Sequence, residues 1–175
     1  MPQYVRSHTP GGTFFFTVAL LERRSRLLVD RIEDLRVSFR KVQSRRPFVI
    51  EAIVVLPDHL HCLWTLPPED HDFSTRWRLN KTRFAGGIPA GERLSARRRA
   101  KGERGIWQRR FWEHTIRDEA DYAAHVDYIH YNSVKHGYVK HPADWKYSSI
   151  HRFIADGRLP VDWAAAPSVE SLDYE

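Results

Sequence analysis

The chain has 175 residues, of which 42% are hydrophobic and 29% are charged. These values are ordinary for one globular domain and exclude a disordered or a fibrous protein. Lys and Arg total 28 against 22 acidic residues, which gives a net charge of +6 and a pI near 9.7. This balance favours polyanionic partners, with nucleic acid ahead of an anionic membrane surface.

Cysteine content and hydropathy restrict the class of protein further. Cys62 is the only cysteine, so an intrachain disulfide and a cysteine-rich zinc cluster are both excluded. No apolar run reaches the roughly 18 to 20 residues of a membrane helix, and the first residues lack the apolar segment of a signal peptide. We expect a soluble, intracellular protein whose metal ligands, if it has any, are His, carboxylate or amide groups.

The first half of the chain alternates strand and helix patterns. Residues 13–20 (TFFFTVAL) form an apolar, β-rich run that predicts a buried strand, and residues 29–44 have the spacing of one amphipathic helix. Two further β-type runs, residues 48–56 and 60–66, flank Pro57-Asp58, which predicts an antiparallel hairpin. A helix is expected over residues 74–84.

The second half opens with a segment rich in Gly and Arg, residues 86–105, for which we expect a mobile basic loop. Residues 107–116 regain β character, residues 118–136 have helical spacing and end before a glycine, and residues 144–155 predict a last short helix. Because the hairpin argues for antiparallel pairing, we predict an α+β fold in which helices pack on an antiparallel sheet in a ferredoxin-like order. One domain over residues 1–163 and a C-terminal tail over residues 164–175 are expected.

The hairpin carries a His-Leu-His triplet at the start of its second strand. Strand alternation directs His59 and His61 to one face and Leu60 to the core. Their Cα atoms would lie about 6.6 Å apart, which allows both rings to reach one cation. In a chain with ten histidines, the triplet alone is more typical of polar residues on a solvated strand.

The helix over residues 118–136 contains a tyrosine outside its apolar arc. At about 100° per residue, Val126 lies about 160° from Tyr128, whereas Asn132 lies about 40° and Asp121 about 20° from it. A tyrosine suits phosphodiester transfer because the phosphotyrosine keeps the energy of the broken bond. Its hydroxyl needs activation at neutral pH, which a metal ion at the phosphate would supply. An amphipathic tyrosine at the sheet edge is the structural alternative.

Cationic side chains alternate with aromatic ones in three segments. Cations can follow phosphates and rings can stack on unpaired bases, a pattern typical of single-strand binding, although solvated cations and core tryptophans would look the same. The candidate DNA-binding residues are Arg76, Trp77, Arg78, Lys81, Arg83, Arg97, Arg98, Arg99, Arg109, Arg110 and Lys135.

Three long motifs in order, PDHLHCLWTLP, WQRRFWEHTIRDEADY and VDYIHYNSVKHGYV, resemble the REP-associated tyrosine transposases, which are related to single-tyrosine insertion-sequence transposases of the HUH superfamily. The similarity extends over residues 4–163. It implies that His59 and His61 bind a metal, that Tyr128 is the nucleophile, and that Asn132 occupies the position of an amide ligand. It also implies Mg²⁺ or Mn²⁺ as the cofactor, no use of ATP, and a cytoplasmic, nucleoid-associated bacterial protein.

The resemblance implies a reaction as well, namely cleavage and rejoining of single-stranded DNA at the foot of a hairpin like a repetitive extragenic palindrome. Two features depart from the family pattern. Ser133 stands where the family usually has proline, which puts the third ligand in doubt, and the Arg-rich insert is longer than usual. A hairpin-binding protein without cleavage activity is one alternative. Another is a mobile dimeric transposase whose tyrosine serves its partner's metal, whereas the resemblance favours a monomer.

Overall fold

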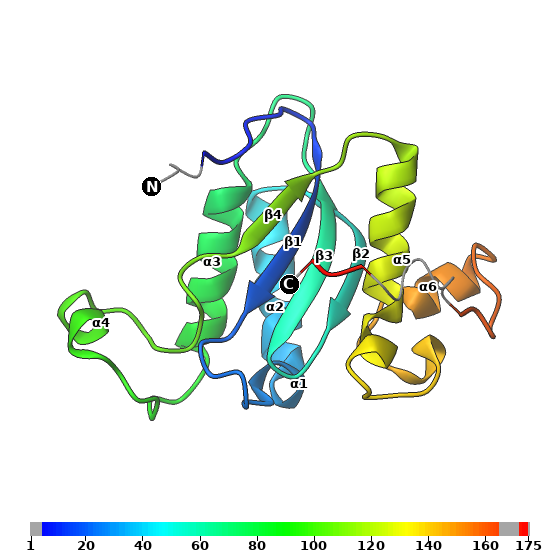
Figure 1. Ribbon diagram of the computed structural model, residues 1–175. Coiled ribbons are helices and arrows are strands. Elements are labelled where there is room, and N and C mark those ends of the chain that lie inside the picture. The colour runs from blue at the N-terminus through cyan, green and yellow to red at the C-terminus, as the bar shows by residue number, and fades with distance from the viewer. Residues whose placement is uncertain (1–4, 165–171, 175) are drawn as a thin grey trace.

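A computed structural model describes residues 5–164 and 172–174, and Figure 1 shows its elements in space. In chain order these are β1 (Thr13–Ala19), α1 (Leu27–Asp30), α2 (Ile32–Arg45), β2 (Val49–Val55), β3 (His59–Thr65), α3 (Phe73–Gly86), α4 (Ala96–Ala100), β4 (Trp112–Thr115), α5 (Glu119–Lys135), the 3-10 turn η1 (Pro142–Asp144) and α6 (Ile150–Ala155). In this part of the chain, no helix is long and apolar enough to cross a membrane.

The four strands form one sheet in the order β2-β3-β1-β4, and every neighbouring pair is antiparallel. The predicted hairpin is therefore present as β2 and β3. Since β1 and β3 are the central strands, both are hydrogen-bonded along their two edges. This arrangement confirms the predicted α+β fold with a ferredoxin-like strand order.

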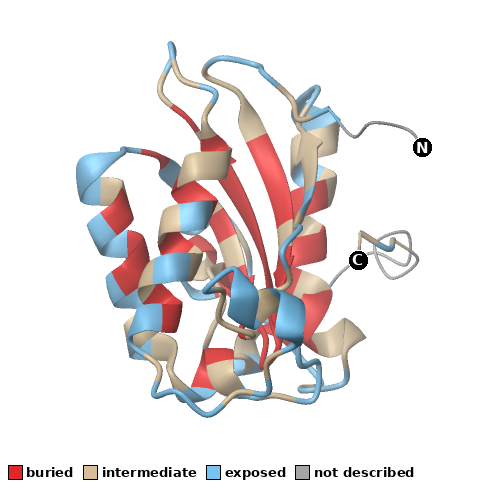
Figure 2. Cartoon of the chain, turned by 90° about the vertical axis from the view of Figure 1, so that its left-hand side faces the viewer, coloured by how far each residue is buried: buried red, intermediate tan, exposed pale blue. Residues whose placement is uncertain are grey.

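One face of the sheet is covered by α2 and α3 and holds the larger apolar core. Strand alternation sends Phe14 and Phe16 of β1 and Trp64 of β3 to this face. The Trp64 ring stacks on that of Trp77 in α3, with centroids 4.3 Å apart and planes 12° apart. All of these rings are buried, and Figure 2 shows buried residues along the central strands and on parts of the helices beside them.

The other face is covered by α5, with α6 on the outer side of that helix, and its apolar core is smaller. Phe15 and Leu63 point to this side, where they meet Ile129 of α5. The same alternation that buries Leu60 in the first core turns His59 and His61 toward α5. The described C-terminal residues, Leu172 to Tyr174, pack on this face as well.

Several element boundaries differ from the predictions. The single helix expected over residues 29–44 is two helices, because the chain breaks at Arg31 between α1 and α2. The expected strand over residues 107–116 contracts to β4, preceded by one isolated bridge between Leu20 and Trp107. The last predicted helix is divided into η1 and α6, since residues 147–149 instead bond along the edge of β2. The predicted tail lies largely outside the described residues.

The segment over residues 86–105 projects beside α3 (Figure 1) but is more ordered than a basic loop would be. It contains α4, whose N-cap Ser95 accepts a hydrogen bond from the Arg98 amide. Arg104 donates to the carbonyls of Ala85 and Ile88 and pairs with Glu92. Part of the positive charge of this insert therefore holds its own fold together.

Candidate active site

His59 and His61 lie side by side on β3, with ring centroids 5.0 Å apart. Both are buried, at 1% and 0% exposure. The strand pairing places Ala19 opposite His59 and Thr17 opposite His61 on β1. The structure thus brings the two imidazoles together on one face, as the strand alternation predicted.

The hydrogen bonds of Thr17 fix which nitrogen of His61 carries a proton. The Thr17 hydroxyl has one hydrogen and donates it to the carbonyl of Tyr174 at 2.7 Å. Its contact of 2.9 Å with Nδ1 of His61 must then be accepted from the ring. The lone pair of His61 is consequently on Nε2, a buried atom that forms no hydrogen bond with any described residue. Burial also holds the pKa of His61 well below its ordinary value, which favours the neutral ring.

His59 is oriented by a carboxylate. Its Nδ1 lies 2.8 Å from Oδ1 of Asp58, whose other oxygen accepts a hydrogen bond of 2.6 Å from Arg23. Burial alone would raise the pKa of Asp58, but the hydrogen bonds from His59 and Arg23 outweigh it and lower that pKa to about 2. Asp58 is therefore ionised at neutral pH and accepts the Nδ1 proton, which directs the Nε2 lone pair of His59 away from it. Carboxylate–imidazole pairs of this kind orient histidine ligands of metals.

Tyr128 faces the histidine pair from α5. It is 1% exposed, and its ring centroid lies 5.3 Å from that of His61. One turn beyond Asn132, the ring of His136 lies 4.9 Å from that of His59. Asn132 is one turn from Tyr128 and one turn from His136, so its side chain belongs to the stripe that covers the two histidines.

Asn132 is fully buried, and neither its amide nitrogen nor its amide oxygen hydrogen-bonds to any described residue. A buried amide left without a partner typically costs about 1 to 3 kcal/mol, so such groups in native proteins call for a ligand or water. Together with Nε2 of His61, it forms a set of nitrogen and oxygen donors suited to a divalent cation. These orphaned atoms fit the metal that the resemblance implies.

The prediction that Tyr128, Asn132 and Asp121 share one side of the helix agrees with the structure, but that side is not the solvated one. Both Tyr128 and Asn132 are buried against the sheet, whereas the apolar Ala123 on the same helix is exposed. The reason is that α5 lies between the sheet and α6 and buries two of its faces. A polar stripe on a helix therefore does not by itself identify a solvated face.

Lys135 stands beside the tyrosine hydroxyl. Its ammonium group donates to the Tyr128 hydroxyl oxygen at 3.3 Å and lies 5.0 Å from the centre of that ring. It also contacts Leu172 and Asp173 near the end of the chain. The sequence placed Lys135 among the candidate DNA contacts, and the structure adds a contact with Tyr128.

Thr17, Asp58 and His136 complete the site and were not singled out from the sequence. Asp58 directly precedes the triplet, so its position in PDHLH was an available signal. Thr17 could be recognised only from the pairing of β1 with β3, because 44 positions separate it from His61.

Two of the predicted DNA contacts are wrong. Arg76 is 1% exposed and donates to the carbonyls of Arg46, Pro47 and Asp72 and to the carboxylate of Asp70. Trp77 is also 1% exposed, because it packs in the core with Trp64. A buried guanidinium that caps carbonyl groups and a core indole have no surface left for DNA.

The remaining candidates differ in how accessible they are. Lys81 is half-buried and donates to the carbonyl of Gln108, and burial lowers its pKa to about 8. Arg98 and Arg109 both pair with Glu103. Arg83 is half-buried. The exposed candidates are Arg78, Arg97, Arg99, Arg109 and Arg110.

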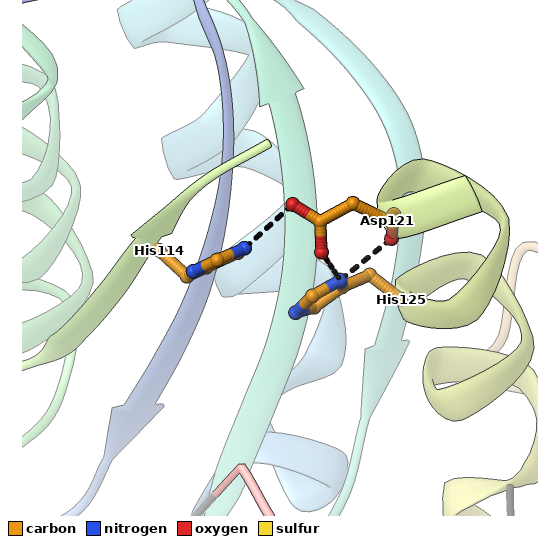
Figure 3. Close-up of side chains that lie close together, drawn as sticks. All are labelled: His114, Asp121 and His125. Atoms are coloured by element: carbon orange, nitrogen blue, oxygen red, sulfur yellow. Dashed lines mark hydrogen bonds and ion pairs between the residues drawn. The ribbon is translucent and has the colours of Figure 1, made fainter. Parts of the chain in front are cut away.

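A second polar cluster joins β4 to α5 (Figure 3). Oδ2 of Asp121 lies 2.8 Å from Nε2 of His114, and Nδ1 of His125 lies 2.7 Å from the backbone carbonyl of Asp121. The two histidine rings are stacked, with centroids 4.7 Å apart and planes 13° apart. A metal ion must lie in the plane of each imidazole that binds it, and two parallel stacked rings do not share such a point. In its present geometry this cluster therefore links β4 to α5 and is not arranged to bind a metal ion.

A four-stranded antiparallel sheet that presents two histidines to a tyrosine on a covering helix defines a transposase-like α+β protein. No protein-family profile matches the chain. It is 50% identical to the REP-associated tyrosine transposase of Escherichia coli (strain K12) over 164 residues, which cover 94% of this chain and 92% of the relative. A relative from Haemophilus influenzae with the same family name is 44% identical over 171 residues, 97% of each chain.

A solved structure of a REP-associated tyrosine transposase bound to a REP hairpin superposes with a TM-score of 0.82. It shares 49% sequence identity and covers 95% of this chain and 93% of its own. The chain belongs to the REP-associated tyrosine transposases.

Proposed function

We propose that this protein cleaves and rejoins single-stranded DNA at the foot of REP-like hairpins, through a metal-dependent reaction in which Tyr128 forms a phosphotyrosine. The observation that carries the proposal is the position of Tyr128, whose ring lies against His61 and whose hydroxyl accepts a hydrogen bond from Lys135. The relative that was solved with a REP hairpin shares the fold over 95% of this chain and supports the choice of substrate.

His59, His61 and Asn132 would hold the divalent cation, Mg²⁺ or Mn²⁺. Thr17 and Asp58 keep the two rings in the tautomer with the lone pair on Nε2, and the Asn132 amide supplies a further donor. When bound, such a cation neutralises charge that develops on the phosphate.

Tyr128 performs the exchange of bonds. Its phenolic oxygen forms the new bond to phosphorus while the bond from phosphorus to a deoxyribose oxygen breaks, and one proton moves from the phenol to the released hydroxyl in the net reaction. One phosphate ester replaces another, so the strand can be rejoined without an external energy source. Lys135 stabilises negative charge on the phenolic oxygen.

The DNA backbone would follow a group of cations beside α3 and the insert, some exposed and some half-buried. A cavity of about 710 Å³ lies there, and its lining includes Arg6, Arg78, Lys81, Arg98 and Arg109. With Arg97, Arg99 and Arg110 exposed nearby in sequence, the surface carries the charge density that phosphates require. We therefore propose this side of the molecule for binding the hairpin.

The proposal is tested with a labelled REP-like hairpin that carries single-stranded flanks, incubated with Mn²⁺ or Mg²⁺ and analysed under denaturing conditions. We expect a covalent adduct with the wild-type chain, none with Tyr128→Phe, and an unchanged yield with Tyr122→Phe, a matched control on the same helix. An adduct that persists in Tyr128→Phe, or in the double variant His59→Ala with His61→Ala, would contradict the mechanism. Tight hairpin binding without any adduct would favour the alternative of a non-cleaving hairpin-binding protein.

A further inference from the structure

Four flat rings beside Tyr128 lie nearly parallel to their neighbours. Trp112 and His114 project from the same side of β4, with ring planes 6° apart. The ring of Tyr174 stacks on His125 with centroids 4.4 Å apart and planes 19° apart, and lies 5.9 Å from Trp112 with planes 18° apart. The ring of Phe15 lies on a third side of Tyr174, with the two ring centroids 5.6 Å apart. We call the space between Trp112, His125 and Phe15 the ring slot.

One wall of the ring slot, the His125 ring, is held by a hydrogen bond. The Nδ1 atom of His125 is bound to the carbonyl of Asp121, which sets the plane of the ring (Figure 3). His125 is 1% exposed, and its Nε2 hydrogen-bonds to no described residue. Trp112 is 40% exposed, so the ring slot opens to solvent on that side. The slot accordingly has the shape for one planar ring and an entrance for it.

The ring slot is directly connected to the candidate active site. The backbone amide of Tyr174 lies 3.4 Å from the Tyr128 hydroxyl, and its carbonyl accepts the Thr17 hydrogen bond. A group whose ring fills the slot therefore has its backbone next to the attacking oxygen. In a nucleotide, one sugar joins the phosphate to the base, so a base in the slot keeps its own backbone on the side of the attacking oxygen.

We propose that the ring slot binds an unpaired nucleobase adjacent to the phosphate that Tyr128 attacks, with Trp112 and His125 as the stacking surfaces. The proposal rests on the proposed function and adds a determinant of where the strand is cut. An unpaired base is required because both faces of a planar ring must be accessible. The incoming base takes the place of the Tyr174 ring. Any base can stack in the slot, but an abasic nucleotide cannot. The slot therefore determines which phosphate along the strand is cleaved and does not read the base sequence.

Abasic scanning tests this proposal. A series of hairpins carries a single abasic site at each unpaired flanking position, and the rate of adduct formation is measured for each. With wild-type protein, we expect one position near the cleaved phosphate at which the abasic site slows the reaction by roughly 5- to 150-fold, the range for the loss of one stacked base. With Trp112→Ala the same abasic site should change the rate clearly less than in the wild type, because one of the two stacking surfaces is already lost. Trp112→Phe should restore the sensitivity, and Trp163→Ala, an aromatic control away from the slot, should leave it unchanged.

A second measurement separates this proposal from the reaction itself. In the Tyr128→Phe background, 2-aminopurine at the sensitive position should be quenched on binding, and Trp112→Ala should reduce the quenching. If adducts form but abasic losses in Trp112→Ala are the same as in the wild type, the ring slot does not bind a base, and the proposed function stands. If no adduct forms with any hairpin but the quenching depends on Trp112, the proposed function fails and the slot stands.

Discussion

The two faces of the sheet use the same strands for different purposes. Toward α2 and α3, β1 and β3 contribute Phe14, Phe16 and Trp64 to an apolar core. Toward α5 they contribute Thr17, His59 and His61. Helix α5 contributes further polar residues to this face, and some of their buried atoms hydrogen-bond to no described residue. Apolar burial dominates the first face, where only single nitrogens of Trp64, Trp77 and Asn80 hydrogen-bond to no described residue. On the second face such atoms belong to potential metal ligands, among them His61, His125 and Asn132, and they cost stability. The difference indicates that one face maintains the fold and that the other is shaped for a ligand.

The largest expected effect contrasts one ring from each face. Trp77→Ala leaves a cavity in the first core and should lower the free energy of unfolding by about 3 to 5 kcal/mol, as measured by urea denaturation. Tyr128→Phe removes only a hydroxyl and should change that free energy by less than about 1 kcal/mol, although it should abolish the adduct. A Tyr128→Phe protein that is as unstable as Trp77→Ala would refute the division between the faces.

The next contrast concerns two arginines on one helix. Arg76→Ala leaves three carbonyls and Asp70 without their buried partner and should cost about 3 kcal/mol of unfolding free energy. Arg78→Ala, at an exposed position, should cost less than about 0.5 kcal/mol. In hairpin-binding titrations, the slope of log affinity against log salt should fall by about 0.7 to 0.9 in Arg78→Ala if this residue neutralises a phosphate. An equal change of slope in both variants would place Arg76 at the DNA after all.

A smaller effect with the opposite sign is expected at Asn132. Asn132→Leu has a similar volume and removes a buried unsatisfied amide, so in metal-free buffer it should raise the free energy of unfolding by about 1 to 2 kcal/mol. The rate of adduct formation should fall by at least about 10-fold, because losing a group that only orients a metal ligand already lowers metal affinity or activity by about that factor.

Ser133→Ala is the matched control for Asn132→Leu, because Ser133 is also fully buried and its hydroxyl hydrogen-bonds to no described residue. It should leave the rate unchanged. A loss of stability in Asn132→Leu, or full activity, would show that Asn132 is an ordinary core residue.

The smallest expected effect is an acid transition on the α5 face. Burial alone would raise the pKa of Asp121, but hydrogen bonds from His114 and from the Arg117 amide outweigh it and lower the pKa to about 2. The stability that the ionised group contributes is complete above its ordinary value near 4 and is lost as the pH falls from about 4 to about 2. Asp121→Asn should flatten urea stability curves in this window and cost about 1 kcal/mol at neutral pH. Asp34→Asn, whose exposed partner is Arg31, should barely change them.

Local patterns predicted much of this fold. The hairpin and the shared face of His59 and His61 follow from strand alternation around one Pro-Asp turn, and both are determined by neighbouring residues. Helix spacing also placed Tyr128 and Asn132 together. In each case the information needed was contained in a few consecutive residues.

Long-range packing supplied the rest. Arg76 and Trp77 have the side-chain types of a DNA-binding surface, and only the packing of α3 on the sheet shows that they are buried. Thr17 orients His61 across a strand pair that no local pattern specifies. Likewise, the order of the insert depends on Arg104 reaching carbonyls of α3 and the residues after it, 16 or more positions away.

The central position of β3 has a consequence for motion. Strands that are bonded along both edges generally exchange their amide hydrogens only on global unfolding, whereas a helix held by side-chain packing alone can shift in smaller openings. His59 and His61 therefore lie on the least mobile backbone of the molecule, and Tyr128 lies on an element that can move without it. Such an arrangement keeps the two imidazoles in place while the tyrosine, and any strand attached to it, changes position between one bond exchange and the next.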